Sequence, residues 1–215
     1  MYLPLAFKGV GMRCLIIGGG EVALRKLEFL AAAGCEVTVI APRIHNEIQS
    51  AVTAQGVQWI AREFAPGDCS GYQLVIAATE RRETNLTIFE EAAALCIPIN
   101  VVDDPELCTV IFPAVWRQGP LTISVNTEGT APFMAAAVRD RLSSQGASLS
   151  RWVETAARFR AAVRSETSDW KEKNSLYRRF AESIRPGDPP NPPESTELRC
   201  WLVWLETLGK DGSGE

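Results

Sequence analysis

The strongest constraint on the fold of this chain is the stretch 12–34, where three consecutive glycines separate two apolar segments of different periodicity. The four apolar residues 14–17 have the length and composition of a buried strand. After the glycines, apolar residues recur at the i, i+4, i+7 spacing of a helix that ends near Gly34. The stretch therefore predicts a strand, a tight turn and a helix in succession.

A strand, glycine turn and helix in this order begin many dinucleotide-binding folds. Gly18 would permit the tight turn, and Gly20 would let the backbone approach a pyrophosphate. Ala23 stands where helix and strand pack closely, and the amides at the helix start would face the phosphates. The alternative interpretation is a tight turn that binds no cofactor.

The residues that follow repeat this alternation. Further strands are expected at 36–41, 57–61, 74–78 and 97–102. One helix ends at Gly56 and another spans 84–95. The run 74–78 is entirely apolar, which is typical of a strand covered on both faces. We therefore expect an α/β fold, a Rossmann-like doubly wound parallel sheet with helices on both faces.

Beyond Asp104 the pattern changes. The sequence predicts a dinucleotide-binding domain, a small α+β segment and a helical accessory domain, at 1–108, 109–147 and 148–215. The middle segment contains short strands at 109–112 and 121–126 and a helix from about 131. In the last domain, helices are expected at 148–165, 170–184 and 198–208. Four tryptophans are expected to build its core: Trp152, Trp170, Trp201 and Trp204.

Charge and composition argue against several classes of function. A net charge of −4 without a basic block argues against nucleic-acid binding, and no apolar run approaches the roughly 18 residues of a membrane span. The first residues lack the pattern of a signal peptide, so we expect a cytoplasmic protein. Six cysteines without CxxC spacing and a single histidine, His45, predict no metal site. His45 is expected to lie at the surface or to cap a helix.

Ligands of parallel sheets bind outside the carboxyl ends of the strands. Three predicted strands end on that edge, at Gly18, Thr79 and Asp103. Asp103 would bring a carboxylate beside the cofactor cleft, although an aspartate in an Asp-Asp-Pro sequence can also serve only to form a turn. The residues alone leave both interpretations open.

The end of the second strand departs from the usual NAD-binding pattern. The acidic residue that binds the ribose hydroxyls is replaced by Pro42 and Arg43. Arg43 would contact the adenosine ribose or a 2′-phosphate, so NADP stays open, and a solvated arginine at a helix start is the other interpretation.

A second loop leads from a predicted strand into a helix N-terminus. Its residues Thr127, Gly129 and Thr130 would bind an anion or a carboxylate group there. Capping of the helix by Thr130 is the simpler interpretation, and the two are compatible.

The order of these motifs resembles the precorrin-2 dehydrogenase/sirohydrochlorin ferrochelatase family, the N-terminal module of siroheme synthase. The resemblance covers about 3–145 and rests on GGGEVALRK at 18–26, AATE at 77–80, Asn85, NVVDDPELC at 100–108, FPAV at 112–115 and TEGTAP at 127–132. It implies NAD-dependent oxidation of precorrin-2 to sirohydrochlorin, often with Fe²⁺ insertion to give siroheme. It also implies a homodimer, with 109–147 as the dimerisation segment.

The resemblance also implies roles for single residues. The family's key carboxylate falls on Asp103, and its hydroxyl position, phosphorylated in some members, falls on Thr127. Its cofactor contacts fall on Glu21, Val22, Pro42 and Arg43. The carboxylates of precorrin-2 need positive charge, for which Arg25, Lys26, Arg117, Arg139 and Arg141 are candidates. The alternative is a non-catalytic NAD- or tetrapyrrole-binding sensor or carrier, which would not need Asp103.

Overall fold

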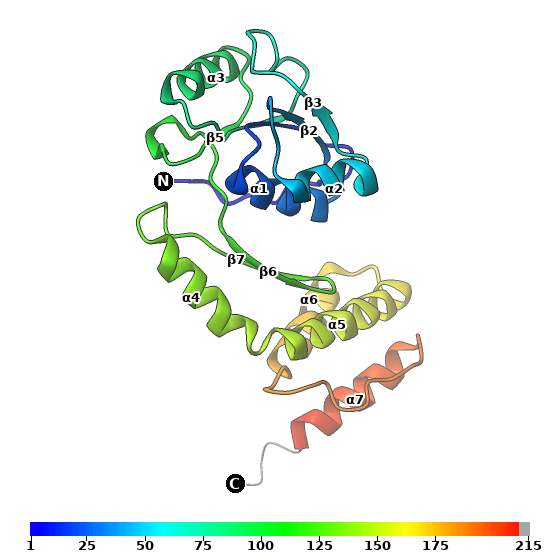
Figure 1. Cartoon of the computed structure of the whole chain (residues 1–215). Helices are drawn as coiled ribbons and strands as arrows, with labels where there is room; N and C mark the ends of the chain where they lie inside the picture. Colours follow the sequence, from blue (N-terminus) through cyan, green and yellow to red (C-terminus); the bar gives the residue numbers. More distant parts are fainter. Residues whose placement is uncertain (211–215) are drawn as a thin grey trace. The chain divides into compact units, whose positions relative to one another are not determined.

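The computed structural model describes residues 1–210, apart from the side chains at 54, 55, 209 and 210. The chain divides into two compact units, Met1–Phe112 and a second that begins at Pro113 (Figure 1). Two apolar clusters form the core of the first unit, and a third forms the core of the second.

The first unit is built on a parallel sheet whose strands follow the order β3-β2-β1-β4-β5. These strands are β1 (Arg13–Ile17), β2 (Glu36–Ile40), β3 (Gln58–Ile60), β4 (Leu74–Ala77) and β5 (Ile99–Val101). The chain changes winding direction between β1 and β4, which is where ligands of doubly wound sheets bind. The predicted Rossmann-like α/β fold is confirmed.

Helices cover both faces of this sheet, α1 (Glu21–Ala32) and α2 (Asn46–Gln55) on one face and α3 (Arg82–Ala94) on the other (Figure 1). In β1, Cys14 and Ile16 belong to the cluster beneath α1. Leu15 and Ile17 belong to the cluster beneath α3. A strand buried on both faces must be apolar at every buried position, so the continuous apolar run correctly indicated a central strand.

Gly34 follows the C-cap residue of α1 and closes the helix, as predicted. The amide of Gly34 donates to the carbonyl of Ala31 at 2.9 Å, and that of Cys35 donates to the carbonyl of Leu30 at 3.1 Å. These paired bonds form a Schellman cap. The cap leads the chain directly into β2.

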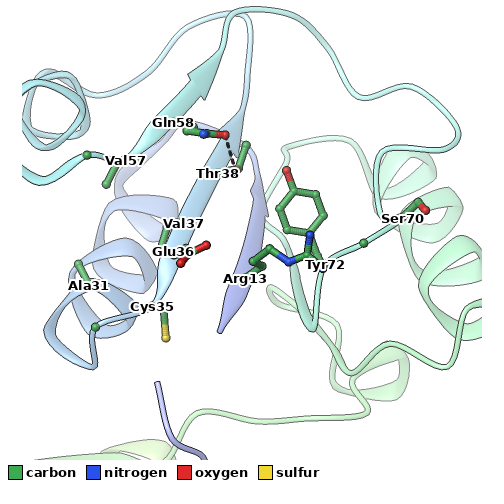
Figure 2. A pocket seen from close by; sticks show the side chains of 13 residues that line it. Arg13, Ala31, Cys35, Glu36, Val37, Thr38, Val57, Gln58, Ser70 and Tyr72 are labelled. Atoms are coloured by element: carbon green, nitrogen blue, oxygen red, sulfur yellow. Dashed lines mark hydrogen bonds between the residues drawn. The ribbon is translucent and has the colours of Figure 1, made fainter. Parts of the chain in front are cut away.

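The connection from β3 to β4 is a loop without a helix, and it lies on the α3 face of the sheet. Its residue Cys69 is buried in the α3 cluster, and the carboxylate of Glu91 accepts hydrogen bonds from the amides of Gly67 and Cys69 at 2.8 and 2.7 Å. Near the end of the loop, a hollow of about 760 Å³ is lined by Arg13 and Tyr72, among others (Figure 2). This hollow lies at the amino edge of the strands, opposite the glycine turn.

The second unit begins with an antiparallel hairpin of β6 (Ala114–Gln118) and β7 (Leu121–Val125), on which α4 (Pro132–Ser143) packs. The predicted strand at 109–112 is wrong. The amides of Thr109 and Val110 both donate to the carbonyl of Ile99, at 2.9 and 3.1 Å. They close the loop after β5 instead of pairing with another strand.

Helices α5 (Gly146–Glu166), α6 (Trp170–Glu182) and α7 (Leu198–Lys210) enclose an aromatic core in the second unit. Its buried rings are Trp152, Phe159, Phe180, Trp201 and Trp204. The prediction that Trp170 joins this core is wrong, since its side chain is 69% exposed. Trp170 is the first residue of α6, so it lies at the end of the helix. The sequence also predicts a frayed end at 209–215, and most of this segment lies outside the described residues.

Candidate functional site

The glycine turn joins β1 to α1 at the carboxyl edge of the sheet. Gly18 has φ +122°, and a Cβ there would lie 2.1 Å from the carbonyl oxygen of Ala78, which follows β4. The amide of Gly18 donates to the carbonyl of Ile40 at 2.9 Å. Only glycine tolerates both this φ and this approach, so the turn is packed between the ends of two neighbouring strands.

Gly20 lies in a different environment. It is the N-cap residue of α1, has no side-chain cap, and a Cβ there would meet no atom within 4 Å. The first turn of α1 lines an open cavity at the positive end of the helix dipole. Such a helix start binds anions, phosphate groups above all.

A cavity of about 800 Å³ opens beside this turn. Its lining includes five of the predicted cofactor residues: Gly18, Gly20, Pro42, Arg43 and Thr79. The loop after β2 is held to the turn because the amide of His45 donates to the carbonyl of Gly19 at 2.8 Å. His45 also caps α2, with Nδ1 accepting from the amide of Glu47 at 3.3 Å, as expected.

A second cavity, of about 440 Å³, contains the other predicted residues of the first unit. Glu21 and Val22 from the first turn of α1 line it together with Asp103. Gly20 and Thr79 line both cavities. The two cavities therefore adjoin along the carboxyl edge of the sheet.

Asp103 and Asp104 occupy different environments in the turn after β5. Asp104 forms an ion pair with Arg82. Its Oδ2 lies 3.1 Å from Nη2 of the arginine and accepts a hydrogen bond from Nε at 3.2 Å. Asp103 is exposed, has φ +60°, and its carboxylate has no hydrogen bond or ion pair to any described residue. A carboxylate that served only to form the turn would bond to nearby amides, so this geometry favours a role towards a ligand.

Asn85 is a site residue to which the sequence assigned no role. Its side chain is 6% exposed. Its Oδ1 accepts from the hydroxyl of Thr79 at 2.6 Å and from the amide of Thr79 at 3.3 Å, while Nδ2 donates to the Thr79 carbonyl at 3.1 Å. These bonds shape the strand end at which both cavities meet. The sequence pattern that could have identified Asn85 is a polar residue at helical spacing from the buried Ile88 and Ala92 of α3.

Several candidate cations have other partners. Arg25 pairs with Glu21, and Arg139 pairs with Asp140 at 2.6 Å. The ammonium of Lys26 lies 4.0 Å from the ring centre of Phe112, and burial lowers the pKa of Lys26. None of these three contacts supports binding of a substrate carboxylate.

The loop with Thr127, Gly129 and Thr130 belongs to the second unit. Capping by Thr130 is wrong: its hydroxyl donates to the carbonyl of Thr127 at 2.6 Å, and the N-cap of α4 is Ala131, without a side-chain cap. The amide of Ala131 instead donates to the hydroxyl oxygen of Thr127 at 3.3 Å. Binding of a ligand by this loop stays a prediction.

Residues 1–210 contain neither a cluster of metal-ligating side chains nor a helix able to cross a membrane. No group of three or more His, Cys, Asp or Glu side chains there is arranged to hold a metal ion. None of the helices in this range combines the length and hydropathy that a membrane crossing requires.

Comparison with known proteins relates the chain to named families. A family model described as "Putative NAD(P)-binding" matches residues 5–114. Siroheme synthase of Pseudomonas putida (strain W619) is 39% identical over 177 residues, which cover 82% of this chain and 38% of that protein. Siroheme synthase of Ectopseudomonas mendocina (strain ymp) is 39% identical over 215 residues, which cover 97% of this chain and 46% of that protein. The chain spans less than half the length of these relatives.

A solved structure with the same fold is that of SirC, precorrin-2 dehydrogenase. It matches with a TM-score of 0.70 at 18% identity and covers 98% of this chain and 100% of that chain. The siroheme synthases confirm the resemblance read from the motifs, and the family model confirms that the chain belongs to an NAD(P)-binding family.

Proposed function

Because this chain belongs to the NAD(P)-binding family whose model matches residues 5–114, we propose that it oxidises precorrin-2 to sirohydrochlorin with NAD, a step of siroheme biosynthesis. The name shared by its relatives, siroheme synthase, supports this pathway. The observation that carries the proposal is the cavity shared by Asp103 and the start of α1, next to the glycine-turn cavity. A carboxylate in this position supports proton removal beside a bound dinucleotide.

The residues of the glycine turn fit a dinucleotide. The open space at Gly20 and the uncapped start of α1 suit a pyrophosphate. We assign cofactor binding to Gly18, Gly20, Glu21, Val22, Pro42, Arg43 and Thr79. When bound, NAD supplies the hydride acceptor of the oxidation.

We assign the general base to Asp103. Oxidation of precorrin-2 removes two hydrogens, one with its bonding electron pair and one as a proton. The first goes to the nicotinamide, and the Asp103 carboxylate takes up the proton. Its neighbour Asp104 is engaged by Arg82 and holds the turn.

Charge supports NAD over NADP. The glycine-turn cavity is lined by three carboxylates, Glu63, Glu80 and Glu83, and by two guanidinium groups, Arg43 and Arg81. An additional 2′-phosphate would enter a site without surplus positive charge. We therefore expect NADH to bind more tightly than NADPH.

We extend the proposal to substrate and assembly. Thr127, Gly129 and Thr130 would bind substrate carboxylates at the uncapped start of α4.

A homodimer is supported by Met134, Val138 and Leu142, which leave an apolar stripe of α4 exposed at i, i+4 spacing. Fe²⁺ insertion into sirohydrochlorin would be a second activity, and both reactions would take place in the cytoplasm, where NAD is available.

The decisive experiment is an anaerobic assay of the protein with precorrin-2 and NAD. We expect NADH and sirohydrochlorin to form in equal amounts, followed by their absorbance. Omitting NAD is the control for spontaneous oxidation. Binding of NAD or precorrin-2 without turnover would contradict the proposal and favour a sensor or carrier. A separate assay with sirohydrochlorin and Fe²⁺ tests the second activity against the spontaneous rate.

A further inference from the structure

The backbone that carries Asp103 needs support from its surroundings. Asp103 is in the left-handed region, at φ +60°. Such a conformation in a non-glycine residue persists only where neighbouring groups hold it. Asp103 also lies two residues after the end of β5, an edge strand whose outer backbone groups have no neighbouring strand to bond.

The thiol of Cys108 contacts these backbone groups. Its Sγ accepts from the amide of Val101 at 3.2 Å and from Nδ2 of Asn100 at 3.5 Å. The same sulfur lies 3.1 Å from the carbonyl of Val101 and 3.4 Å from the carbonyl of Asp104, so its single proton can be donated to either oxygen. One side chain thus bridges the backbone two residues before Asp103 and one residue after it.

We propose that Cys108 is a positioning residue, whose thiol holds the turn 101–104 so that Asp103 lines the cavity at the start of α1. This role rests on the proposed function, in which Asp103 removes a proton. Cys108 itself lines neither cavity.

The surroundings of the thiol keep it able to donate and accept. Burial raises the pKa of Cys108, although the nearby Lys26 ammonium opposes this shift, so the proton stays on sulfur at neutral pH. The short helix η1 (Pro105–Leu107) brings the side chain back, because the amide of Cys108 donates to the carbonyl of Pro105 at 3.2 Å. The Arg82–Asp104 ion pair supports the turn from α3, but the Arg82 side chain is 78% exposed, and exposed ion pairs hold weakly.

The test compares three variants of the full chain. Cys108→Ala removes the bridge, Cys108→Ser restores a group that donates and accepts, and Cys35→Ala is the matched control. Cys35 is a half-buried cysteine of the same unit, but it lies at the amino edge of the sheet (Figure 2). The measurements are kcat and KM for precorrin-2 and the affinity for NADH.

We expect kcat of Cys108→Ala to fall at least about tenfold, because a base displaced by a fraction of an ångström loses its alignment with the proton. NADH affinity should be unchanged, and Cys108→Ser should recover most of the lost rate. Cys35→Ala should match the unmodified protein. Wild-type kcat in Cys108→Ala would overturn the proposal, as would equal losses of rate and NADH affinity without rescue by serine.

A readout without substrate separates this proposal from the proposed function. Hydrogen exchange at the Val101 amide should be at least about tenfold faster in Cys108→Ala than in the unmodified protein or in Cys108→Ser. If the unmodified protein does not oxidise precorrin-2, the proposed function fails while the exchange rate still reports on the bridge. Unchanged exchange in Cys108→Ala would show that the thiol does not hold the turn.

Discussion

At the residue scale, two adjacent aspartates have different environments in the turn after β5. Asp104 is held by Arg82, whereas Asp103 lines the cavity at the start of α1. The turn pattern by itself cannot rank the two carboxylates, because an Asp-Asp-Pro turn accommodates either role, whereas the family resemblance assigns the key carboxylate to Asp103. The left-handed φ of Asp103 decides which substitution tests it.

Asp103→Asn should reduce kcat at least about 100-fold, because an amide cannot take up the proton. Asparagine tolerates the left-handed region as aspartate does, so NADH affinity and the free energy of unfolding should not change. Asp103→Ala should lose the same activity and also about 1 kcal/mol of stability. Turnover and urea unfolding of both variants check this, and an active Asp103→Asn would return the residue to the role of a turn former.

Asn85→Ala should cost about 1–3 kcal/mol of folding free energy, because it removes a buried side chain together with its hydrogen bonds to the half-buried Thr79. Since Thr79 lines both cavities, the affinity for NADH should also fall. Glu90→Ala, at an exposed position of α3, is the control and should change stability by less than about 0.5 kcal/mol. Thermal unfolding and NADH titration distinguish the two effects, and an Asn85→Ala protein with unchanged NADH binding would contradict the positioning of Thr79.

At the scale of elements, the glycine turn shows two different reasons for glycine in one sequence. Gly18 is required by the fold, because β4 ends against it. Gly20 has room for a side chain within the protein, so under the proposed function its glycine serves the approach of the cofactor rather than the fold. A sequence pattern cannot separate these reasons, since both positions read as glycine.

Gly18→Ala should destabilise the first unit by at least about 3 kcal/mol, because its Cβ would overlap the Ala78 carbonyl at an unfavourable φ. Gly20→Ala should keep stability within about 1 kcal/mol, as expected for an N-cap substitution in open space. It should nevertheless weaken NADH binding, since the added methyl occupies the approach to the phosphates. Circular dichroism and NADH titration check the pair, and normal NADH binding by Gly20→Ala would count against a pyrophosphate at this turn.

At the scale of the whole molecule, the two units carry different cores and therefore respond differently to pH. Buried thiols belong to the first unit: burial, with a smaller contribution from Cys35, raises the pKa of Cys14 to about 12. Burial raises the pKa of Cys69 to about 12 as well, with Glu91 contributing. The described core of the second unit is aromatic and aliphatic.

In the unfolded chain these thiols titrate near pH 9, so above that pH the unfolded state loses protons that the folded state keeps. The stability they contribute is complete below pH 9 and is lost as the pH rises towards 12, by up to about 1.4 kcal/mol per pH unit and thiol. Urea unfolding between pH 8 and 11 should show this decline. Cys14→Ala and Cys69→Ala should each make the decline of the unfolding free energy with pH less steep. Cys96→Ser, at an exposed thiol, should leave the decline unchanged.

The sequence by itself determined the elements of the first unit and their order. Its signals are local: an all-apolar strand, a glycine turn and helical periodicity each arise from neighbouring residues. Because these signals are local, they also predicted that Gly18, Thr79 and Asp103 lie at strand ends, and hence at one edge of the sheet. The helices of the second unit were predicted for the same reason.

Only the tertiary structure decided the features that depend on residues far apart in the chain. The prediction of a strand at 109–112 was wrong because amides of this segment bond to the carbonyl of Ile99. The prediction of a buried Trp170 was wrong because the end of α6 lies outside the aromatic core. Likewise, the partners of Asn85 and Cys108 follow from the folding of the loops at the strand ends. Periodicity records which side of an element is buried, whereas a hydrogen bond depends on where another segment brings its partner.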